Sequence, residues 1–597
     1  MIRLNNVSKY LTILLVLIAW LPAQAQDQNP NLQRELTLEK EYSPSLRDAN
    51  KINRLPDVKE PEAPQTRVEF SNYTLDYPGS PYFQKIGVIN YFPGFADSDK
   101  RGYLNAGLSN LLNINGDLGY QILQSATDRL SVFGSHRSSN SRVPYLQNDE
   151  KRKMKINDNC LGLDIKHYFK KATLSADAQY TLSSFNYYGF PATDQVMPVF
   201  DFILPIYSDN QENNLLKIHT GIRSAETQKL SYRLNFGYTS FKQKQAGFAA
   251  LPGKTENRML FDIGLHAQIH ATAGIGMDGA VKGYAYRLPE DIKYAFLDEN
   301  MGNYNYTTGI INPYLTFEGG SWDARLGVKA DIQWGGIKNF VPSPDIRFRW
   351  RPSDPVLLYL TAEGGIKDNS AYTMYYENRY VDPLYRVYDS KSPFDGSLGI
   401  VFSPVGDVSV DVFAGYKWVN DEHFYFAEPY DTDVSDADNL GQKILPQYAA
   451  AKTFKLGGSV KYQYQNLFDL SLKLVYNQWN ITKISEEINT NPFSEQKPVA
   501  WNKPVFTGDG NMGFKIPSLP FRVDLAYHLE TGRKALQGVE TVSMKDIHDL
   551  SAAATFTISK SLSVFAKANN LLFQKYDFWQ GYPAQGFNIM GGISWKF

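Results

Sequence analysis

Histidine and carboxylate side chains stand at two places in this sequence where their spacing could support chemistry. His266 and His270 lie four residues apart, and histidine is a common metal ligand. On a strand they would share a face but lie about 13 Å apart, which is too far for one metal ion. His423, Asp421 and Ser435 are the residue types of a hydrolase triad, yet no nucleophile motif surrounds them. We therefore predict no metal site and no catalytic residue here.

Two further patterns have the spacing of ligand-binding sequences. Gly274, Gly276 and Gly279 match the glycines of a dinucleotide-binding loop, which requires a strand before it and a helix after it. The surrounding sequence favours strands, so small residues at a sheet bend explain these glycines better. The segment Glu428–Asp438 is rich in carboxylates that could bind Ca²⁺, but it lacks the glycine and the closing glutamate of an EF-hand loop. The sequence thus predicts no cofactor.

The N-terminus has the layout of a secretory signal peptide. Arg3 and Lys9 supply the positive charge that precedes an apolar run from Leu11 to Leu21. Ala23 and Ala25 then form a small-residue cleavage site. The alternative, an N-terminal membrane anchor, is disfavoured because the run is short for a membrane span. We predict a signal peptide over residues 1–25. The chain has one cysteine, so we expect no intramolecular disulfide in the oxidising periplasm.

The composition excludes some classes of protein and suggests one. The chain has 597 residues and a formal net charge of -1, so it lacks the basic excess of a nucleic-acid-binding protein. Hydrophobic residues make up 43% of the chain and aromatic residues 14%, while the mean hydropathy is -0.38. After the signal peptide no apolar run is long enough for a transmembrane helix. A β-barrel with an apolar outside and a polar inside reconciles these values.

Period-2 alternation favours such a barrel. From Trp322 to Trp334 every second residue is apolar, and the residues between them are mostly charged or polar. Successive side chains of a strand point to opposite faces, so one face is apolar and ends in tryptophan on both sides. The clearest runs last about 9–13 residues, enough to cross a bilayer, whereas strands of soluble proteins have about 5–6. The alternation predicts these lumen-facing residues: Arg325, Lys329, Asp331, Arg347, Arg349, Arg351, Arg522 and Asp524.

Short turns and long polar loops alternate along the chain. Tight connections such as Phe169–Lys171 and Gln465–Asn466 are separated by longer segments, and we expect long loops at Asn140–Arg152, Lys367–Ser390 and Asn420–Tyr448. Short periplasmic turns and long outer loops are typical of outer-membrane barrels. The sequence therefore predicts an all-β fold, a transmembrane antiparallel β-barrel over residues 101–597 with about 22 strands, or 20 as the alternative. An even number brings both ends of the barrel to the periplasmic side.

The C-terminal segment alternates with particular regularity. Every second residue from Phe587 to Phe597 faces one way. Gly592, Trp595 and Phe597 resemble the C-terminal signal by which the outer-membrane assembly machinery recognises barrels. Met590 departs from that signal, in which a polar residue is usual at its position. We expect outer-membrane lipid and the barrel-assembly machinery to be partners of this chain.

Residues 26–100 differ from the rest of the chain. The part up to Gln65 is charged and punctuated by proline, which predicts an extended or disordered segment. From Val68 to Phe95 aromatic residues are frequent, and we expect this part to be ordered, in or under the lumen. Glu35–Glu39 alternates and could add as a strand to a periplasmic partner, although a solvated tether is the simpler interpretation. We predict a periplasmic N-terminal segment that is partly disordered.

The predicted strand number, the long outer loops and the terminal Trp595-Lys596-Phe597 resemble the barrels of TonB-dependent receptors over residues 101–597. The resemblance implies a location in the outer membrane of a Gram-negative cell and a role in transport. Such receptors carry a folded plug domain ahead of the barrel, for which residues 26–100 leave little room, so we expect a relative without a plug. We predict a receptor-like channel or solute-binding barrel that is not an enzyme. The alternative is a barrel subunit of an outer-membrane complex for assembly, export or surface-protein handling, with periplasmic or outer-membrane protein partners.

Overall fold

The computed structural model of the chain describes residues 100–190, 210–225, 229–246, 254–287, 304–336, 338–383, 385–404, 407–427, 443–465, 467–485, 499–537 and 540–597. The predicted signal peptide, the segment 26–99 with its aromatic part, and the acidic segment Glu428–Asp438 lie outside the described residues.

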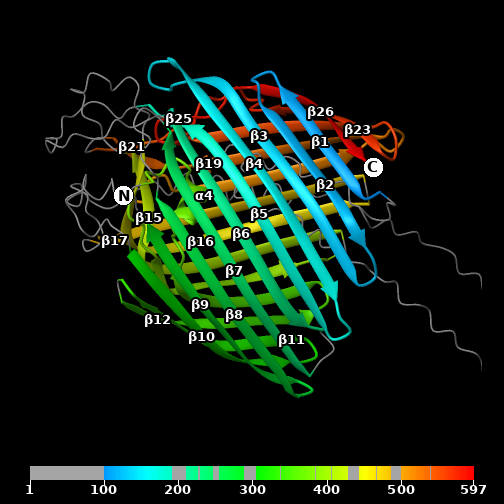
Figure 1. Cartoon of the computed structure of the whole chain (residues 1–597), viewed down its shortest axis with the longest axis vertical. Helices are drawn as coiled ribbons and strands as arrows, with labels where there is room; N and C mark the ends of the chain where they lie inside the picture. Colours follow the sequence, from blue (N-terminus) through cyan, green and yellow to red (C-terminus); the bar gives the residue numbers. More distant parts are fainter. Residues whose placement is uncertain are drawn as a thin grey trace, which may run out of the picture. The chain divides into compact units, whose positions relative to one another are not determined.

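One antiparallel sheet of 22 strands closes on itself, because β1 pairs with β2 on one side and with β26 on the other. Figure 1 shows these strands side by side and tilted along the barrel. The predicted fold class and the strand number of 22 are confirmed, and the alternative of 20 is wrong. The strands are β1 (Gly102–Ser109), β2 (Ile114–Gln124), β3 (Asp128–Pro144), β4 (Lys151–Tyr168), β5 (Ala172–Asn186), β6 (Asn210–Ser224), β7 (Leu230–Ala246), β8 (Thr255–His270), β9 (Ala273–Arg287), β10 (Tyr304–Glu318), β11 (Trp322–Trp334), β12 (Asn339–Ser353), β13 (Val356–Lys367), β14 (Ser390–Phe402), β15 (Val408–Ala427), β16 (Ile444–Tyr464), β17 (Phe468–Ile484), β18 (Phe506–Lys515), β19 (Phe521–Thr531), β22 (Ile547–Thr557), β23 (Leu562–Asn569) and β26 (Asn588–Lys596).

The long connections contain the remaining elements. These are the helix α4 (Ala371–Glu377) and two small hairpins, β20 (Lys534–Gln537) with β21 (Glu540–Ser543) and β24 (Asp577–Trp579) with β25 (Tyr582–Pro583). No helix within the described ranges is long and apolar enough to cross a membrane.

The outer face of the barrel is apolar, as the alternation predicts. On β11 the exposed side chains are those of Trp322, Leu326, Val328, Ile332 and Trp334, while the residues that alternate with them are less exposed. The two ends of the barrel sequence meet at the end that carries the short turns, where the backbone N–H of Gly102 donates to the carbonyl oxygen of Phe597 at 2.8 Å. Both chain ends of the barrel therefore lie on the short-turn side, which an even number of strands requires.

Two of the predicted loops are shorter than expected. β3 and β4 run into Asn140–Arg152 from both sides, and β15 and β16 run into Asn420–Tyr448. In the extension of β4 the apolar side chains of Met154 and Ile156 face the interior and are buried, while the outward residues are polar. The pattern with apolar residues on the outside therefore ends part-way along β4, although the strand itself continues.

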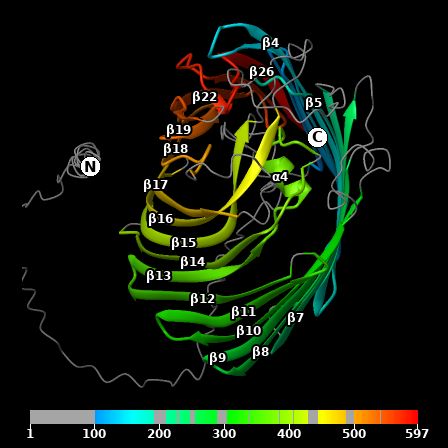
Figure 2. The same ribbon diagram turned by 90° about the vertical axis from the view of Figure 1, so that its left-hand side faces the viewer.

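A large cluster of buried apolar side chains lies inside the barrel, at the end with the long connections. It joins wall residues such as Met154, Phe185 and Tyr284 to residues of the β13–β14 connection such as Met374 and Tyr380. Figure 2 shows α4 within the ring of strands. A closed sheet of 22 strands is too wide for its own side chains to fill, so inserted chain supplies the core at this level.

Candidate functional site

The β13–β14 connection, residues Asp368–Asp389, folds into the barrel, and we call it the inner loop. Its helix α4 begins after Ser370, whose hydroxyl accepts a hydrogen bond from the backbone N–H of Thr373 at 3.4 Å. An isolated helix of 7 residues is not stable in water. Packing holds it instead, because Met374 and Tyr375 are buried in the cluster that also contains the wall residues.

A buried ion pair fastens the inner loop to the wall at β4 and β5. Arg379 Nη2 lies 2.8 Å from Asp158 Oδ2, and the two side chains are only 4% and 3% exposed. The hydroxyl of Ser183 donates to the same Asp158 carboxylate and lies 2.7 Å from the hydroxyl of Tyr375. The Arg379 guanidinium also lies 5.3 Å from the centroid of the Phe185 ring. Loop and wall thus share one buried network of charge, hydrogen bonds and aromatic rings.

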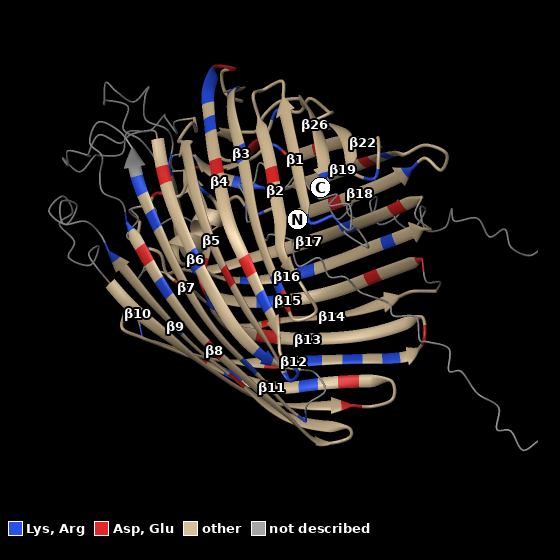
Figure 3. Cartoon of the chain, turned by 45° about the vertical axis from the view of Figure 1, so that its right-hand side comes forward, with Lys and Arg blue, Asp and Glu red and all other residues tan. Residues whose placement is uncertain are grey.

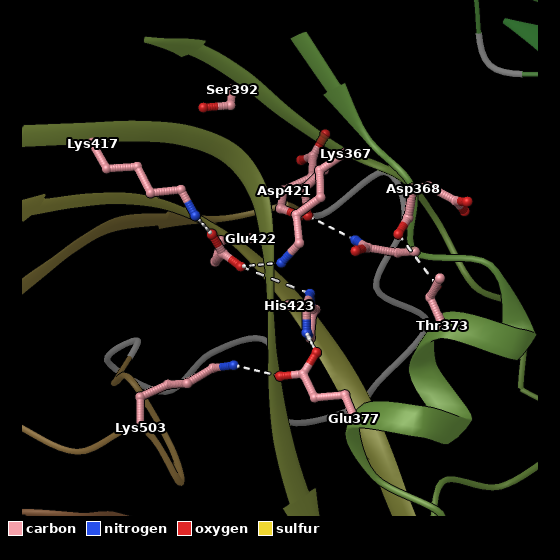
Figure 4. A network of polar contacts seen from close by, with 12 residues as sticks. Lys367, Asp368, Thr373, Glu377, Ser392, Lys417, Asp421, Glu422, His423 and Lys503 are labelled. Atoms are coloured by element: carbon pink, nitrogen blue, oxygen red, sulfur yellow. Dashed lines mark hydrogen bonds and ion pairs between the residues drawn. The ribbon is translucent and has the colours of Figure 1, made fainter. Parts of the chain in front are cut away.

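A second wall contacts the end of α4 through Glu377, as Figure 4 shows. Glu377 Oε2 lies 2.6 Å from Nε2 of His423 on β15, and Oε1 lies 2.8 Å from Nζ of Lys503. Burial alone would raise the pKa of Glu377, but the charges of His423, Lys503 and Lys367 outweigh it and hold the pKa well below its ordinary value. The folded loop therefore favours the ionised carboxylate.

Charges of alternating sign extend this contact across β13, β14 and β15. Glu422 Oε2 lies 2.9 Å from Nζ of Lys417, and Oε1 lies 3.6 Å from Nζ of Lys367. Lys391 on β14 lies 2.7 Å from Asp421. The base of the inner loop is thereby tied to three consecutive strands, and Figure 4 shows the core of this network.

Acidification should weaken the contact at Glu377. Because its pKa in the folded protein lies below that of the unfolded chain, its contribution to stability is present above about pH 4.5 and is lost as the pH falls through the folded-state pKa. We expect the wild type to lose thermal stability between about pH 4.5 and about pH 3, and Glu377→Gln to lose less over that interval. The unfolding midpoint, followed by heat-modifiable electrophoretic mobility, measures this. Parallel losses in the two proteins would contradict the role of Glu377.

Aromatic stacking and an arginine fasten the inner loop at a third place. Tyr380 stacks on Tyr582 of β25, with the ring centroids 3.8 Å apart. The connection that carries β25 is itself held by Arg533, which donates to the carbonyl oxygens of Phe578 and Asp577 at 2.8 and 2.9 Å. The inner loop therefore contacts the barrel wall and a second long connection, and it occupies the lumen at this level.

Several charged residues that the alternation predicts to face the lumen form ion pairs, either within one strand or between nearby strands. Arg325 lies 2.7 Å from both Asp278 on β9 and Asp345 on β12. Lys329 lies 3.3 Å from Asp331, whose side chain is fully buried. Figure 3 shows basic and acidic positions along these strands. The basic and acidic side chains on this wall therefore mostly form ion pairs with one another.

The remaining residues of that set are more exposed on average. Arg522 lies 2.7 Å from both Asp469 and Asp524, and Arg349 lies 2.9 Å from Asp323. Arg347 and Arg351 are exposed, and neither makes an ion pair within the described ranges.

A cavity of about 600 Å³ lies against the inner wall of β13–β18, nearer the short turns than the inner loop is. Its size falls in the range of small-molecule sites. Lys455, Lys461 and Lys473 line it and make no ion pair with any described residue, while Asp411 accepts a hydrogen bond from Tyr359 at 3.0 Å. The cavity offers cationic, anionic and hydroxyl groups to a polar solute.

The two histidines first considered as metal ligands do not meet, and Ser435 lies outside the described residues. His266 and His270 each bond a threonine hydroxyl, at 3.0 and 3.1 Å, and contact different neighbours. Gly274 and Gly276 lie within β9, where a Cβ would collide with the rings of His266 and Tyr314, so packing in a strand explains them. Among the residues that the structure describes, no group of three His, Cys, Asp or Glu side chains is placed to hold a metal ion.

Solved structures with a similar architecture are known. The siderophore receptor PirA from Acinetobacter baumannii superposes with a TM-score of 0.61 at 10% identity, over 84% of this chain and 81% of that chain. The FrpB iron transporter from Neisseria meningitidis gives 0.62 at 8% identity, over 84% and 82%. This chain shares the barrel fold of these two structures. The copper transporter OprC has the same fold, with a TM-score of 0.58 at 10% identity, over 83% and 82%. Neither a family model nor a curated protein sequence matches this chain.

Proposed function

We propose that this protein is a receptor-like outer-membrane barrel that binds a polar solute and passes it through a lumen closed by the inner loop. The observation that carries the proposal is the position of that loop, which Arg379 and Glu377 tie to two different walls. The solved structures with this fold include a siderophore receptor, an iron transporter and a copper transporter, which supports a role in transport.

In this proposal the inner loop does the work of a plug, and the barrel needs no separate plug domain ahead of it. A solute that reaches the cavity of about 600 Å³ finds side chains of both charges there. The inner loop must move before the solute can pass between that cavity and the end of the barrel with the long connections. The proposal assigns no catalytic step to any described residue.

Removing the inner loop should open the lumen. We would replace Ala371–Val387 with a short Gly-Ser linker and measure conductance in planar bilayers. We expect the full-length protein to conduct weakly and the loop-deleted variant to conduct at least about tenfold more, because a wide polar lumen of this type conducts when unblocked.

The same two proteins without residues 26–99 form the control, since they separate any contribution of that segment from that of the inner loop. A full-length wild type that already conducts as strongly as the loop-deleted variant would contradict closure by the inner loop. An increase that appears only when residues 26–99 are removed would assign the closure to that segment instead.

A further inference from the structure

The outward face of β3 and β4 carries exposed basic side chains near the end with the long connections. Arg142 on β3 and Lys153 on β4 are direct cross-strand neighbours, and Lys151 and Lys155 flank Lys153 on the same face of β4. All four side chains are exposed, and we call these four residues the basic cluster. Figure 3 shows basic positions gathered at this end of β4.

No carboxylate in the described part of the chain forms an ion pair that would offset the repulsion within the basic cluster. Like charges directly opposite each other destabilise a sheet. None of the four makes an ion pair with a described residue. The nearby carboxylate of Asp149 pairs with Lys575 at 2.5 Å, and that of Glu150 accepts from Asn148. An arrangement that costs stability in the protein alone is expected where an external anion offsets the cost.

A surface groove of about 730 Å³ adjoins the basic cluster. Lys153 and Lys155 form one side of it, and polar side chains such as Ser138 and Asn157 line its floor. Ile114, which is exposed on the outer face, closes it toward β2. The groove therefore lies on the outside of the barrel, and it combines lysine cations with neutral hydrogen-bonding groups and one carboxylate, that of Glu212 on β6.

The groove lies just beyond the apolar belt, by which we mean the band of exposed apolar side chains on the outer face of the barrel. On β4 the outward side chain of Leu161 is 67% exposed, and the next outward residues toward the long connections are Asn159, Asn157 and Lys155. From Leu161 to Lys155 the strand advances about 20 Å at about 3.3 Å per residue. With the usual tilt of such strands this corresponds to about 15 Å along the membrane normal. Apolar, neutral polar and cationic positions thus follow one another in the order of acyl chain, sugar and phosphate.

We propose that the groove and the basic cluster bind the phosphorylated headgroup of a glycolipid in the outer leaflet. Lys153, Lys155 and Arg142 neutralise its phosphates, and arginine suits this role because its guanidinium can bind phosphate through two parallel hydrogen bonds. The acyl chains of the same molecule lie on the exposed belt at Leu161 and Leu182. A free anion would satisfy the cations but would use neither the belt nor the polar floor of the groove, which favours the lipid as occupant.

Native mass spectrometry of the full-length protein in detergent tests this proposal. The probes are lipid A with two phosphates, the same lipid A after enzymatic removal of both phosphates, and inorganic phosphate as competitor. We expect the wild type to retain the phosphorylated lipid A and not the dephosphorylated form. In the triple variant Arg142→Gln/Lys153→Gln/Lys155→Gln its apparent affinity should fall at least about tenfold, because three phosphate-binding cations are lost.

The matched control removes three lysines from short turns at the opposite end of the barrel, Lys170→Gln/Lys229→Gln/Lys560→Gln, and should retain lipid A as the wild type does. Equal retention by the triple variant, or equal binding of dephosphorylated lipid A, would overturn the proposal. Complete displacement of lipid A by millimolar inorganic phosphate would also overturn it, since the site would then bind a free anion.

A single variant separates binding from a structural role even if the triple variant folds poorly. Lys153→Gln removes the like-charge pair with Arg142, so the unfolding temperature in lipid-free detergent should rise. Its retention of phosphorylated lipid A should fall at the same time. A lower unfolding temperature together with unchanged retention would show that Lys153 serves the fold and not a lipid.

Discussion

Arg379→Met should release the inner loop and open the barrel. The substitution leaves the carboxylate of Asp158 buried, at 3% exposure, without its cation. Breaking a buried pair by removing one partner costs about 3–5 kcal/mol, which is large compared with the other single contacts of the loop. We expect the strands to remain paired, because their ladders do not involve Arg379. Conductance should approach that of the loop-deleted variant.

The double variant Arg379→Met/Asp158→Leu is the control for this prediction. Replacing a buried ion pair by apolar residues of similar volume is often neutral, so closure should largely return. The hydroxyl of Ser183 loses its acceptor in the double variant, but it keeps its contact with the Tyr375 hydroxyl. Weak conductance in Arg379→Met itself would show that the ion pair does not hold the loop.

Gly592→Val should impair closure of the barrel between β1 and β26. A Cβ at Gly592 would collide with the ring of Phe565 and with the backbone carbonyl oxygen of Ala106, and a backbone atom cannot turn aside as a side chain can. Overpacking of this kind costs about 1–3 kcal/mol, and here it acts on the strand pair that closes the sheet. We expect a several-fold lower yield of folded barrel when the denatured protein refolds into lipid vesicles without any assembly machinery.

Gly591→Val is the matched control, because nothing lies within 4 Å of a Cβ built at Gly591. It should refold like the wild type. The pair of variants also addresses the prediction that Gly592, Trp595 and Phe597 form an assembly signal. If Gly592 served recognition alone, Gly592→Val would refold normally in vesicles and fail only in cells.

Much of the barrel could be predicted from the sequence, because the lipid imposes a simple pattern. The strand expected at Trp322–Trp334 has those bounds as β11, and the loop expected at Lys367–Ser390 lies between β13 and β14 as expected. The period-2 alternation with apolar residues on the outer face is sufficient to predict both the strand and the loop, because that pattern depends only on residues that are neighbours in the sequence.

The inward fold of the inner loop has no such local signal. Arg379 and Asp158 are separated by 221 positions, and nothing near either residue in the sequence marks the pair. His423 attracts attention beside Asp421 as a member of a triad, yet its close contact is Glu377, 46 positions earlier. Contacts of this kind form only after the sheet has closed and brought distant walls around the same loop.

Accessibility of position 374 tests the central claim most directly. Met374 on α4 is 1% exposed, and the native cysteine, Cys160, is buried. In a Cys160→Ser background, a thiol introduced by Met374→Cys should not react with a membrane-impermeant maleimide while the barrel is folded. A thiol introduced by Gly320→Cys, in an open turn, should react at once, and adding Arg379→Met should expose position 374. Equal labelling at positions 374 and 320 in the folded protein would contradict closure of the lumen by the inner loop.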